Sequence, residues 1–168
     1  MKSKKSPLSW LWLTLFVLII DQITKYWVAG TFFYGESVNV LPFFNITYVH
    51  NLGAAFSFLA DQSGWQRWFF ATIAFIASIV FIVWLARTPF SDKKLCMALA
   101  LMLSGAVGNL IDRVLLGYVI DFLDFYINDY HWPAFNVADS AIFIGAMIMI
   151  IDSFKKEAAE KTRLKQQK

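Results

Sequence analysis

Four long apolar runs dominate this chain of 168 residues. They cover roughly residues 8–29, 65–85, 95–111 and 137–154, and each is close to the ~20 residues that a helix needs to cross a bilayer. Inside lipid every backbone N–H and C=O must find an internal partner, so continuous apolar runs of this length span as helices. The sequence therefore predicts an all-α integral membrane protein with four transmembrane helices, the short third one tilted or partly buried.

The composition leads to the same class of protein. Hydrophobic residues make up 58% of the chain, charged residues 16%, and the mean hydropathy is +0.55. A soluble domain is roughly 45–50% apolar, and a chain this short cannot hide the excess in its own core. The net charge of +3 does not indicate nucleic-acid binding, because most Lys and Arg residues stand beside the apolar runs. We expect membrane lipids, and no nucleic acid, as partners.

The positions of Lys and Arg also orient the chain in the membrane. They cluster in residues 1–5, 87–94 and 155–168, whereas the links at about 30–64 and 112–135 are nearly free of them. Under the positive-inside rule both termini are cytoplasmic and these two links face outside. The first run is too long for a cleaved signal peptide, so we expect an uncleaved anchor.

The first outer link is more than a plain loop. Its segment 36–50 alternates, is rich in Val, Ile, Phe and Tyr, and is interrupted by Pro42. This pattern predicts two short strands that form a small extracytoplasmic β-sheet subdomain at the membrane surface. The charged tail at 155–168 predicts a frayed cytoplasmic helix, and we expect residues 1–168 to form a single membrane-embedded domain.

Polar side chains that are unfavourable in lipid gather near the outer ends of the runs. An ionisable residue costs about 2.5–3.5 kcal/mol in a membrane helix, so it suggests function by default. The residues concerned are Asp21, Asn109, Asp112, Arg113, Asp121, Asp124 and Asp139. Scattered structural residues have no reason to share one depth. The sequence therefore predicts one site near the outer face.

Structural explanations exist for several of these residues. Asp21 and Lys25 are spaced i, i+4 and can form a simple ion pair. Asn136 and Asp139 fit a capping-box-like arrangement at the start of the fourth helix. The small residues of SGAVG at 104–108 indicate close helix packing.

Asp121 and Asp139 form the pair with the clearest chemical potential. Two carboxylates close together cannot both ionise easily, so one acts as a base and the other as an acid. Such a pair activates water without a metal or a nucleophilic side chain, although the spacing alone does not establish that the two meet. With one Cys and two separated His residues, the sequence predicts no metal and no cofactor. We expect Cys96 to be an inert apolar residue and His50 an ordinary strand residue.

Five short motifs resemble the signature blocks of the bacterial lipoprotein signal peptidases (signal peptidase II), in that family's order. They are DQITK at 21–25, VHNLGAAFS at 49–57, GAVGNLIDR at 105–113, VIDF at 119–122 and FNVADS at 135–140. The resemblance covers roughly residues 10–152 and implies a multi-pass aspartyl endopeptidase of the bacterial inner membrane. Its implied substrates are prolipoproteins carrying diacylglycerol on a Cys, cleaved just before that Cys.

Matched motif by motif, the resemblance implies that Asp121 and Asp139 are the catalytic dyad. It implies that six further residues line or support the site: Asn51, Asn109, Arg113, Asn136, Asp21 and Lys25. Asn51 is expected to bond the substrate backbone, and NLGAAF to help the sheet form a cradle over the lipidated substrate. Because a helix N-terminus favours an anion, Asp139 is expected to be the more readily ionised member of the pair.

Two other functions stay open at this stage. A small proton-coupled transporter needs a relay across the membrane, yet the inner halves of the four runs lack ionisable groups. A membrane assembly factor that only binds partners through its outer sheet predicts tolerance of Asp substitutions. A monomer can hold every residue named, so we expect a monomer.

The orientation can be tested with single cysteines. We expect Ser37→Cys and Asn128→Cys to react with an impermeant thiol reagent added to intact cells, because both lie in links predicted to be outside. Ser91→Cys lies in a Lys- and Arg-rich link and is expected not to react. Labelling of Ser91→Cys from outside would overturn the predicted orientation.

Overall fold

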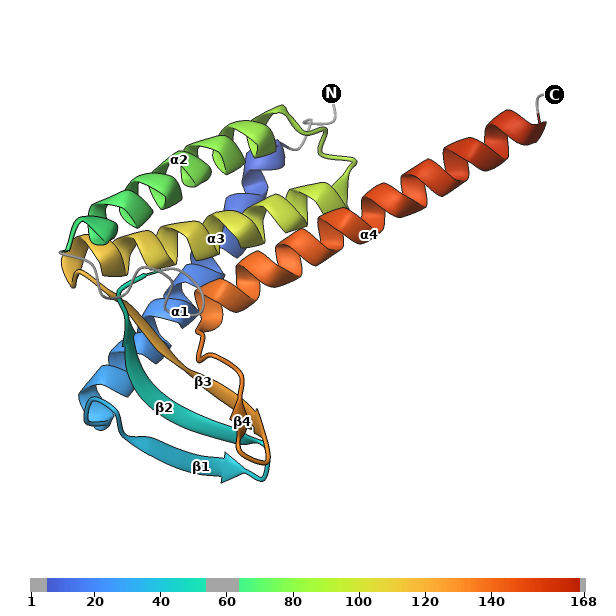
Figure 1. Ribbon diagram of the computed structural model, residues 1–168. Helices are drawn as coiled ribbons and strands as arrows, with labels where there is room; N and C mark the ends of the chain where they lie inside the picture. The colour runs from blue at the N-terminus through green and yellow to red at the C-terminus, as the bar shows by residue number, and fades with distance from the viewer. Residues whose placement is uncertain (1–5, 54–63, 167–168) are drawn as a thin grey trace.

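Long helices form most of the computed structural model, which describes residues 6–53 and 64–166. The helices are α1 (Leu11–Thr31), α2 (Trp65–Arg87), α3 (Lys93–Leu115) and α4 (Val137–Gln166), with a single 3-10 turn, η1 (Pro7–Trp10), before α1 (Figure 1). All four are long and apolar enough to cross a membrane. Together with a small antiparallel sheet they confirm the predicted fold class.

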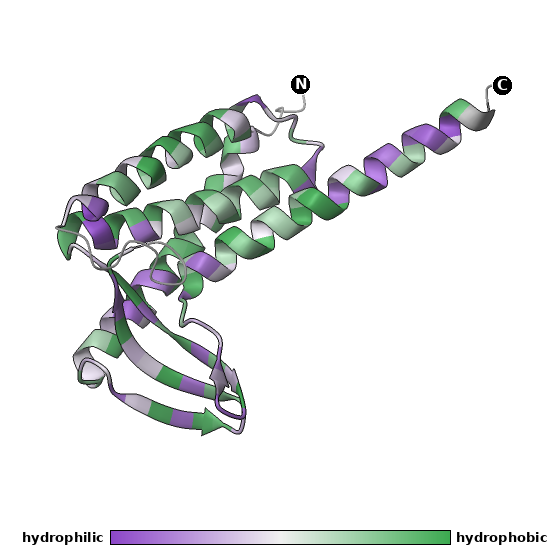
Figure 2. Cartoon of the chain, viewed as in Figure 1, coloured by the Kyte–Doolittle hydropathy of each residue, from purple (hydrophilic) through white to green (hydrophobic). Residues whose placement is uncertain are grey.

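The helix ends differ most from the predicted ones in the third and fourth helices. The third helix runs beyond the predicted 95–111 at both ends, and the polar residue Asp112 in its extension is buried inside the protein. The fourth helix continues through the charged tail to Gln166 without a break. Figure 2 shows this change along α4, from hydrophobic near the bundle to hydrophilic near the C-terminus.

The third helix lies at the centre of the bundle and packs against α1, α2 and α4. In its most apolar window 61% of the residues are buried inside the protein, against 11–22% for the other three helices. The outer helices therefore present apolar side chains that a bilayer covers. The expectation that the third span is partly buried is confirmed.

Glycines allow α3 and α4 to approach closely. A Cβ at Gly105 would meet the carbonyl oxygen of Ala138 and lie 2.6 Å from Cγ1 of Ile142. A Cβ at Gly145 would lie 2.7 Å from the carbonyl oxygen of Ala98. Small residues thus bring the two backbones together, as predicted for the segment 104–108.

The sheet combines strands from both outer links. Strands β1 (Ser37–Leu41) and β2 (Phe44–Asn51) form the predicted pair, joined by a turn at Pro42. The sequence analysis missed β3 (Val119–Ile127) and β4 (Tyr130–His131), which complete an antiparallel sheet in the order β1-β2-β3-β4. Strand β3 is a mostly apolar run without alternation, because its first residues are buried on both faces.

The sheet joins the bundle where α1 ends and α4 begins, with both chain termini on the far side of the helices (Figure 1). A small core holds it there, in which Val28 of α1 packs with Tyr48, Ile120 and Phe122 of the sheet. Cys96 lies in a separate core cluster near the other end of α3, buried beside Leu85 and Leu99. It is the apolar core residue that was expected.

A pair of glycine variants tests the close approach of the helices. We expect Gly145→Ala to lower the free energy of unfolding by about 1–3 kcal/mol, because the backbone at Ala98 cannot move aside easily. Gly30→Ala in α1 is the matched control, since a Cβ there meets nothing within 4 Å. It is expected to raise stability by up to about 1 kcal/mol through helix propensity. Thermal unfolding in detergent measures both, and equal effects would contradict the packing described.

Candidate active site

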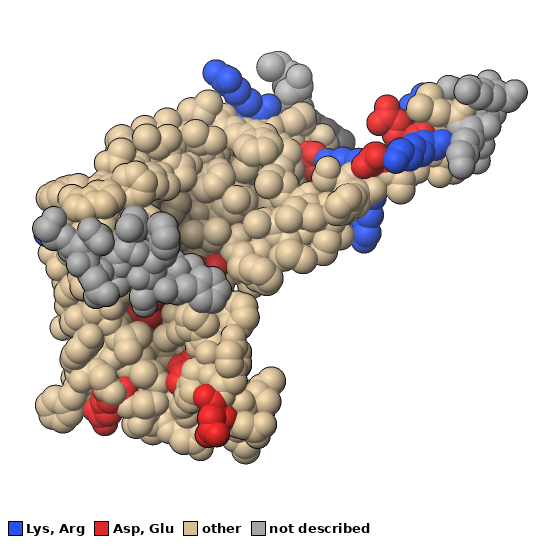
Figure 3. Space-filling view, in the orientation of Figure 1, with Lys and Arg blue, Asp and Glu red and all other residues tan. Residues whose placement is uncertain are grey.

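A cavity of about 790 Å³ opens where the sheet meets the bundle. Asp121 and Asp139 both line it, together with Asn51, Asn109 and Arg113. Figure 3 shows acidic atoms in the recess between the sheet and the helices. The structure therefore brings together the two Asp residues that the sequence could not place side by side.

Strand pairing positions Asp121 at the cavity. In the register of β2 and β3, Val49 stands opposite Asp121 and Asn51 opposite Val119. Asn51 ends β2 and reaches across to Asp121, with its Nδ2 donating to Oδ2 at 2.9 Å. Its Oδ1 accepts from the backbone N–H of Gly53 at 3.1 Å. The expected contact between Asn51 and the substrate backbone stays a prediction.

A helix start positions Asp139. Asn136 is the residue before α4, and its Oδ1 accepts from the Asp139 N–H at 2.9 Å. In return the Asn136 N–H donates to Oδ2 of Asp139 at 3.3 Å. This reciprocal pair is the predicted capping box. Asn109 of α3 adds a bond from its Nδ2 to Oδ1 of Asp139 at 2.7 Å.

Asn136 also connects the two carboxylates. It is completely buried, and its Nδ2 donates to Oδ1 of Asp121 at 2.6 Å. One side chain therefore caps the helix that carries Asp139 and bonds the carboxylate of Asp121. As a result each of the four carboxylate oxygens of the pair accepts a hydrogen bond from the protein.

The surroundings of Asp121 disfavour its charged form. Burial raises the pKa of its carboxyl group to about 7, and the negative charge of nearby Asp139 acts in the same direction. Hydrogen bonds from Asn51 and Asn136 and the charge of Lys25 offset part of this pKa shift. Near neutral pH the pair can thus hold a single proton, the state needed for one acid and one base.

The predicted ion pair of Asp21 and Lys25 is present, and it is larger than expected. Lys25 is 2% exposed, and its Nζ lies 2.9 Å from Oδ2 of Asp21 and 3.0 Å from Oδ2 of Asp112. It also donates to Oδ1 of Asn109 at 3.0 Å. Asp112 was predicted to belong to the polar cluster at this depth, and it is part of this network.

Arg113 lies at the cavity and contacts Gly53 of the second motif. Its Nη2 donates to the carbonyl oxygen of Gly53 at 3.0 Å, and its Nη1 donates to that of Asn109 at 3.3 Å. The rest of NLGAAF, from residue 54 on, lies outside the described residues. The predicted cradle over the substrate stays a prediction.

Asp124 does not join the site, although it shares the depth of the others. Its carboxylate accepts from Asn45 and Thr47 of β2, both at 3.1 Å, and lies 2.8 Å from Nδ1 of His131. Asp121 and Asp124 are three residues apart on one strand, so they face opposite sides of the sheet. The prediction that every acidic residue at this depth converges on one site is wrong for Asp124.

His50 lies outside the dyad and packs among aromatic side chains. In β2, His50 stacks on Tyr118 with ring centroids 3.7 Å apart and bonds the Tyr48 hydroxyl at 2.9 Å. It is the strand residue that was predicted.

Within residues 6–53 and 64–166 no group of three or more His, Cys, Asp or Glu side chains is arranged to hold a metal ion.

Comparison with known proteins identifies the family. Residues 13–155 match the family described as Signal peptidase (SPase) II. The chain belongs to the signal peptidase II family. The lipoprotein signal peptidase of Alteromonas mediterranea is 57% identical over 152 residues, covering 90% of this chain and 84% of the relative. That of Vibrio cholerae (strain M66-2) is 54% identical over 154 residues, covering 90% of both chains.

Solved structures agree with the sequence comparison. A bacterial membrane enzyme solved by the in meso method at 2.3 Å resolution matches with a TM-score of 0.81 and 39% identity, covering 90% of each chain. A second such structure, at 1.9 Å, matches with a TM-score of 0.77 and 38% identity, covering 88% of this chain and 93% of that one. The resemblance read from five motifs is confirmed. A peptidase is supported over the transporter and the assembly factor.

Proposed function

We propose that this signal peptidase II removes the signal peptide from diacylglyceryl-modified prolipoproteins through a catalytic dyad of Asp121 and Asp139. The observation that carries the proposal is a pair of carboxylates on one cavity, Asp121 buried and Asp139 partly buried, with every oxygen held by a hydrogen bond. No other pair of acidic side chains lines that cavity among the described residues. The cleaved bond precedes the lipidated Cys, as the family resemblance implies.

The proposed chemistry uses the single proton of the pair. Asp139 lies in the first turn of α4, where the helix N-terminus favours an anion, so it takes a proton from water. The water oxygen attacks the peptide carbonyl carbon while Asp121 gives its proton to the carbonyl oxygen. The resulting tetrahedral diol collapses when Asp139 protonates the leaving nitrogen, the C–N bond breaks and Asp121 recovers its proton.

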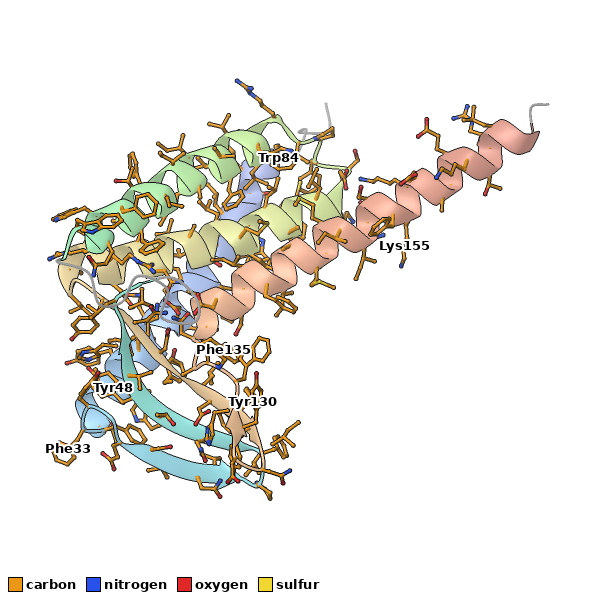
Figure 4. The ribbon with its side chains drawn as sticks, in the orientation of Figure 1. Phe33, Tyr48, Trp84, Tyr130, Phe135 and Lys155 are labelled. Carbon is orange, nitrogen blue, oxygen red and sulfur yellow. The ribbon has the colours of Figure 1, made fainter. Side chains whose placement is uncertain are left out.

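The walls of the cavity suit a substrate that stays in the membrane. Apart from the polar residues, they are mainly apolar side chains of α4 and of the segment before it, namely Trp132, Pro133, Phe135, Ile142 and Phe143. Figure 4 places Phe135 at the junction between the sheet and the start of α4. Acyl chains bound along this wall would bring the scissile bond to the depth of the two carboxylates.

The proposed orientation places the site near the outer face of the inner membrane and both termini in the cytoplasm. In Figure 3, Lys and Arg appear mainly at the end of the bundle away from the sheet and along the tail of α4. The visible charges on the sheet are acidic. This asymmetry supports the positive-inside assignment. All site residues named come from one chain, which supports a monomer as the catalytic unit.

The pH dependence of cleavage tests the role of Asp121 as the acid. Activity is expected to fall as the pH rises through about 7, where Asp121 loses its proton. The amide of Asn51 stabilises the ionised carboxylate, so Asn51→Ala raises the pKa and moves the alkaline limb of kcat to higher pH. Asn45→Ala in the same strand is the control, because Asn45 bonds Asp124 instead. A limb that moves to lower pH in Asn51→Ala would contradict the assignment.

Substitution of the dyad tests the mechanism itself. Asp121→Asn and Asp139→Asn keep nearly the same volume but remove the titratable oxygen, so each is expected to lower kcat by about 10²–10⁴-fold. The double variant is expected to be no slower than either single variant, because the two groups act as a unit. Cleavage of a lipidated lipobox peptide by purified enzyme is the measurement.

Each dyad variant has a control on its own element. Asp124→Asn lies on β3 with Asp121, and Asp152→Asn lies on α4 with Asp139. Neither residue lines the cavity, so both variants are expected to keep most of the activity. A folded Asp139→Asn enzyme that cleaves at close to the wild-type rate would rule out the two-carboxylate mechanism.

A further inference from the structure

Three charged side chains are buried behind the proposed dyad without being part of it. They are Asp21 and Lys25 of α1 and Asp112 of α3, with side chains that are 1%, 2% and 4% exposed. None of them is among the described residues that line the cavity, so they are not placed to touch the substrate. Burying charged side chains is unfavourable, so we expect these three to have a role that compensates for that cost.

The two carboxylates of this cluster reach backbone groups beside the dyad. Oδ1 of Asp21 accepts from the N–H of Ala138 at 2.8 Å, and Ala138 immediately precedes Asp139. Oδ2 of Asp112 accepts from the N–H of Ile120 at 3.2 Å, and Ile120 immediately precedes Asp121. Each catalytic residue therefore has its own backbone anchor.

Two donors from α1 tie the anchors to each other. The ammonium of Lys25 lies 2.9 Å from Asp21 and 3.0 Å from Asp112. The amide of Gln22 donates to both of the same carboxylates, at 3.1 Å each. Gly108 makes room for this arrangement, because a Cβ there would lie 2.6 Å from Oδ2 of Asp21.

We propose that Asp21 and Asp112, linked through Lys25, are paired positioning residues that set the separation of the two catalytic carboxylates. The inference rests on the proposed roles of Asp121 and Asp139. Those residues lie on a strand and on a helix, two elements that approach the cavity independently. Asp21 joins α4 to α1, Asp112 joins β3 to α3, and Lys25 links these two anchors. A shift of the strand or of the helix therefore changes the distance between the catalytic carboxylates.

A positioning role differs from a purely structural one in its kinetics. Misplacing a catalytic group by about 1 Å can lower the rate on the order of 10²-fold while the bound substrate keeps its contacts. Loss of an anchor is therefore expected to lower kcat per folded enzyme and to leave KM nearly unchanged. A residue needed only for folding lowers the amount of folded enzyme and leaves its kcat unchanged.

The experiment compares two substitutions at Asp112 in the full-length enzyme. Asp112→Ala removes the acceptor for Ile120, and we expect kcat to fall by about 10²-fold with KM unchanged. Asp112→Asn keeps a carbonyl oxygen that can accept this N–H, so its kcat is expected to lie between those of Asp112→Ala and the wild type. Cleavage of a lipidated lipobox peptide gives the rates, and thermal unfolding with size exclusion gives the folded fraction.

Asp152→Ala is the matched control for losing a carboxylate from an ion cluster. Asp152 pairs with Lys94 at 3.0 Å and with Lys156 at 2.8 Å, far along α4 from the cavity. The kcat of the Asp152→Ala enzyme is expected to equal that of the wild type.

Two results with the Asp112→Ala enzyme would overturn the inference. Folded Asp112→Ala enzyme with wild-type kcat overturns it, as does a loss that appears only in KM. If Asp112→Ala does not fold, Asp112→Asn decides, and a wild-type kcat in that variant also overturns the inference. The proposed function fails separately, when the Asp121→Asn and Asp139→Asn enzymes still cleave. Inactive dyad variants beside a fully active Asp112→Ala would leave the proposed function intact and remove the positioning role alone.

Discussion

The structure depends on keeping two carboxylates together at one cavity without leaving any of their oxygens unpaired. A buried charge is unfavourable unless hydrogen bonds and opposite charges compensate for it. Here three Asn side chains and one backbone N–H bond the oxygens of Asp121 and Asp139. Much of the polar content of this apolar chain is thereby used around one cavity, where burial still leaves Asp121 with a pKa near 7.

This arrangement requires elements that are far apart in the chain to meet at one point. Helix α1 carries Lys25, α3 carries Asn109 and Asp112, and the sheet carries Asp121. Close contact of α3 with α4 through glycines brings the N-terminus of α4 to the same place. The bundle and the sheet are therefore parts of one site, and the fold holds its polar groups together around one cavity.

The spans, the first two strands and the capping box were predictable, because each follows from local pattern. The errors have a common physical origin. Strand β3 was missed because its pairing partner β2 lies about 70 residues earlier, and its first residues are buried on both faces. Asp124 was grouped with Asp121 by depth, but the alternation of side chains along that strand sends the two to opposite faces. Asp112 was predicted only as a member of the polar cluster, because its partner, the N–H of Ile120, belongs to the backbone.

The sequence by itself determined the four apolar helices, the gathering of polar residues near the ends of these runs and, through five motifs, the family. These properties follow from hydropathy, helix length and short linear patterns, which do not require knowledge of contacts between distant segments. Only the tertiary structure decided that Asp121 and Asp139 face one cavity, that Asn136 bonds both, and that Asp21 of α1 and Asp112 of α3 bond the backbone beside them. Those facts depend on strand register and helix packing, which arise from contacts between residues far apart in the chain.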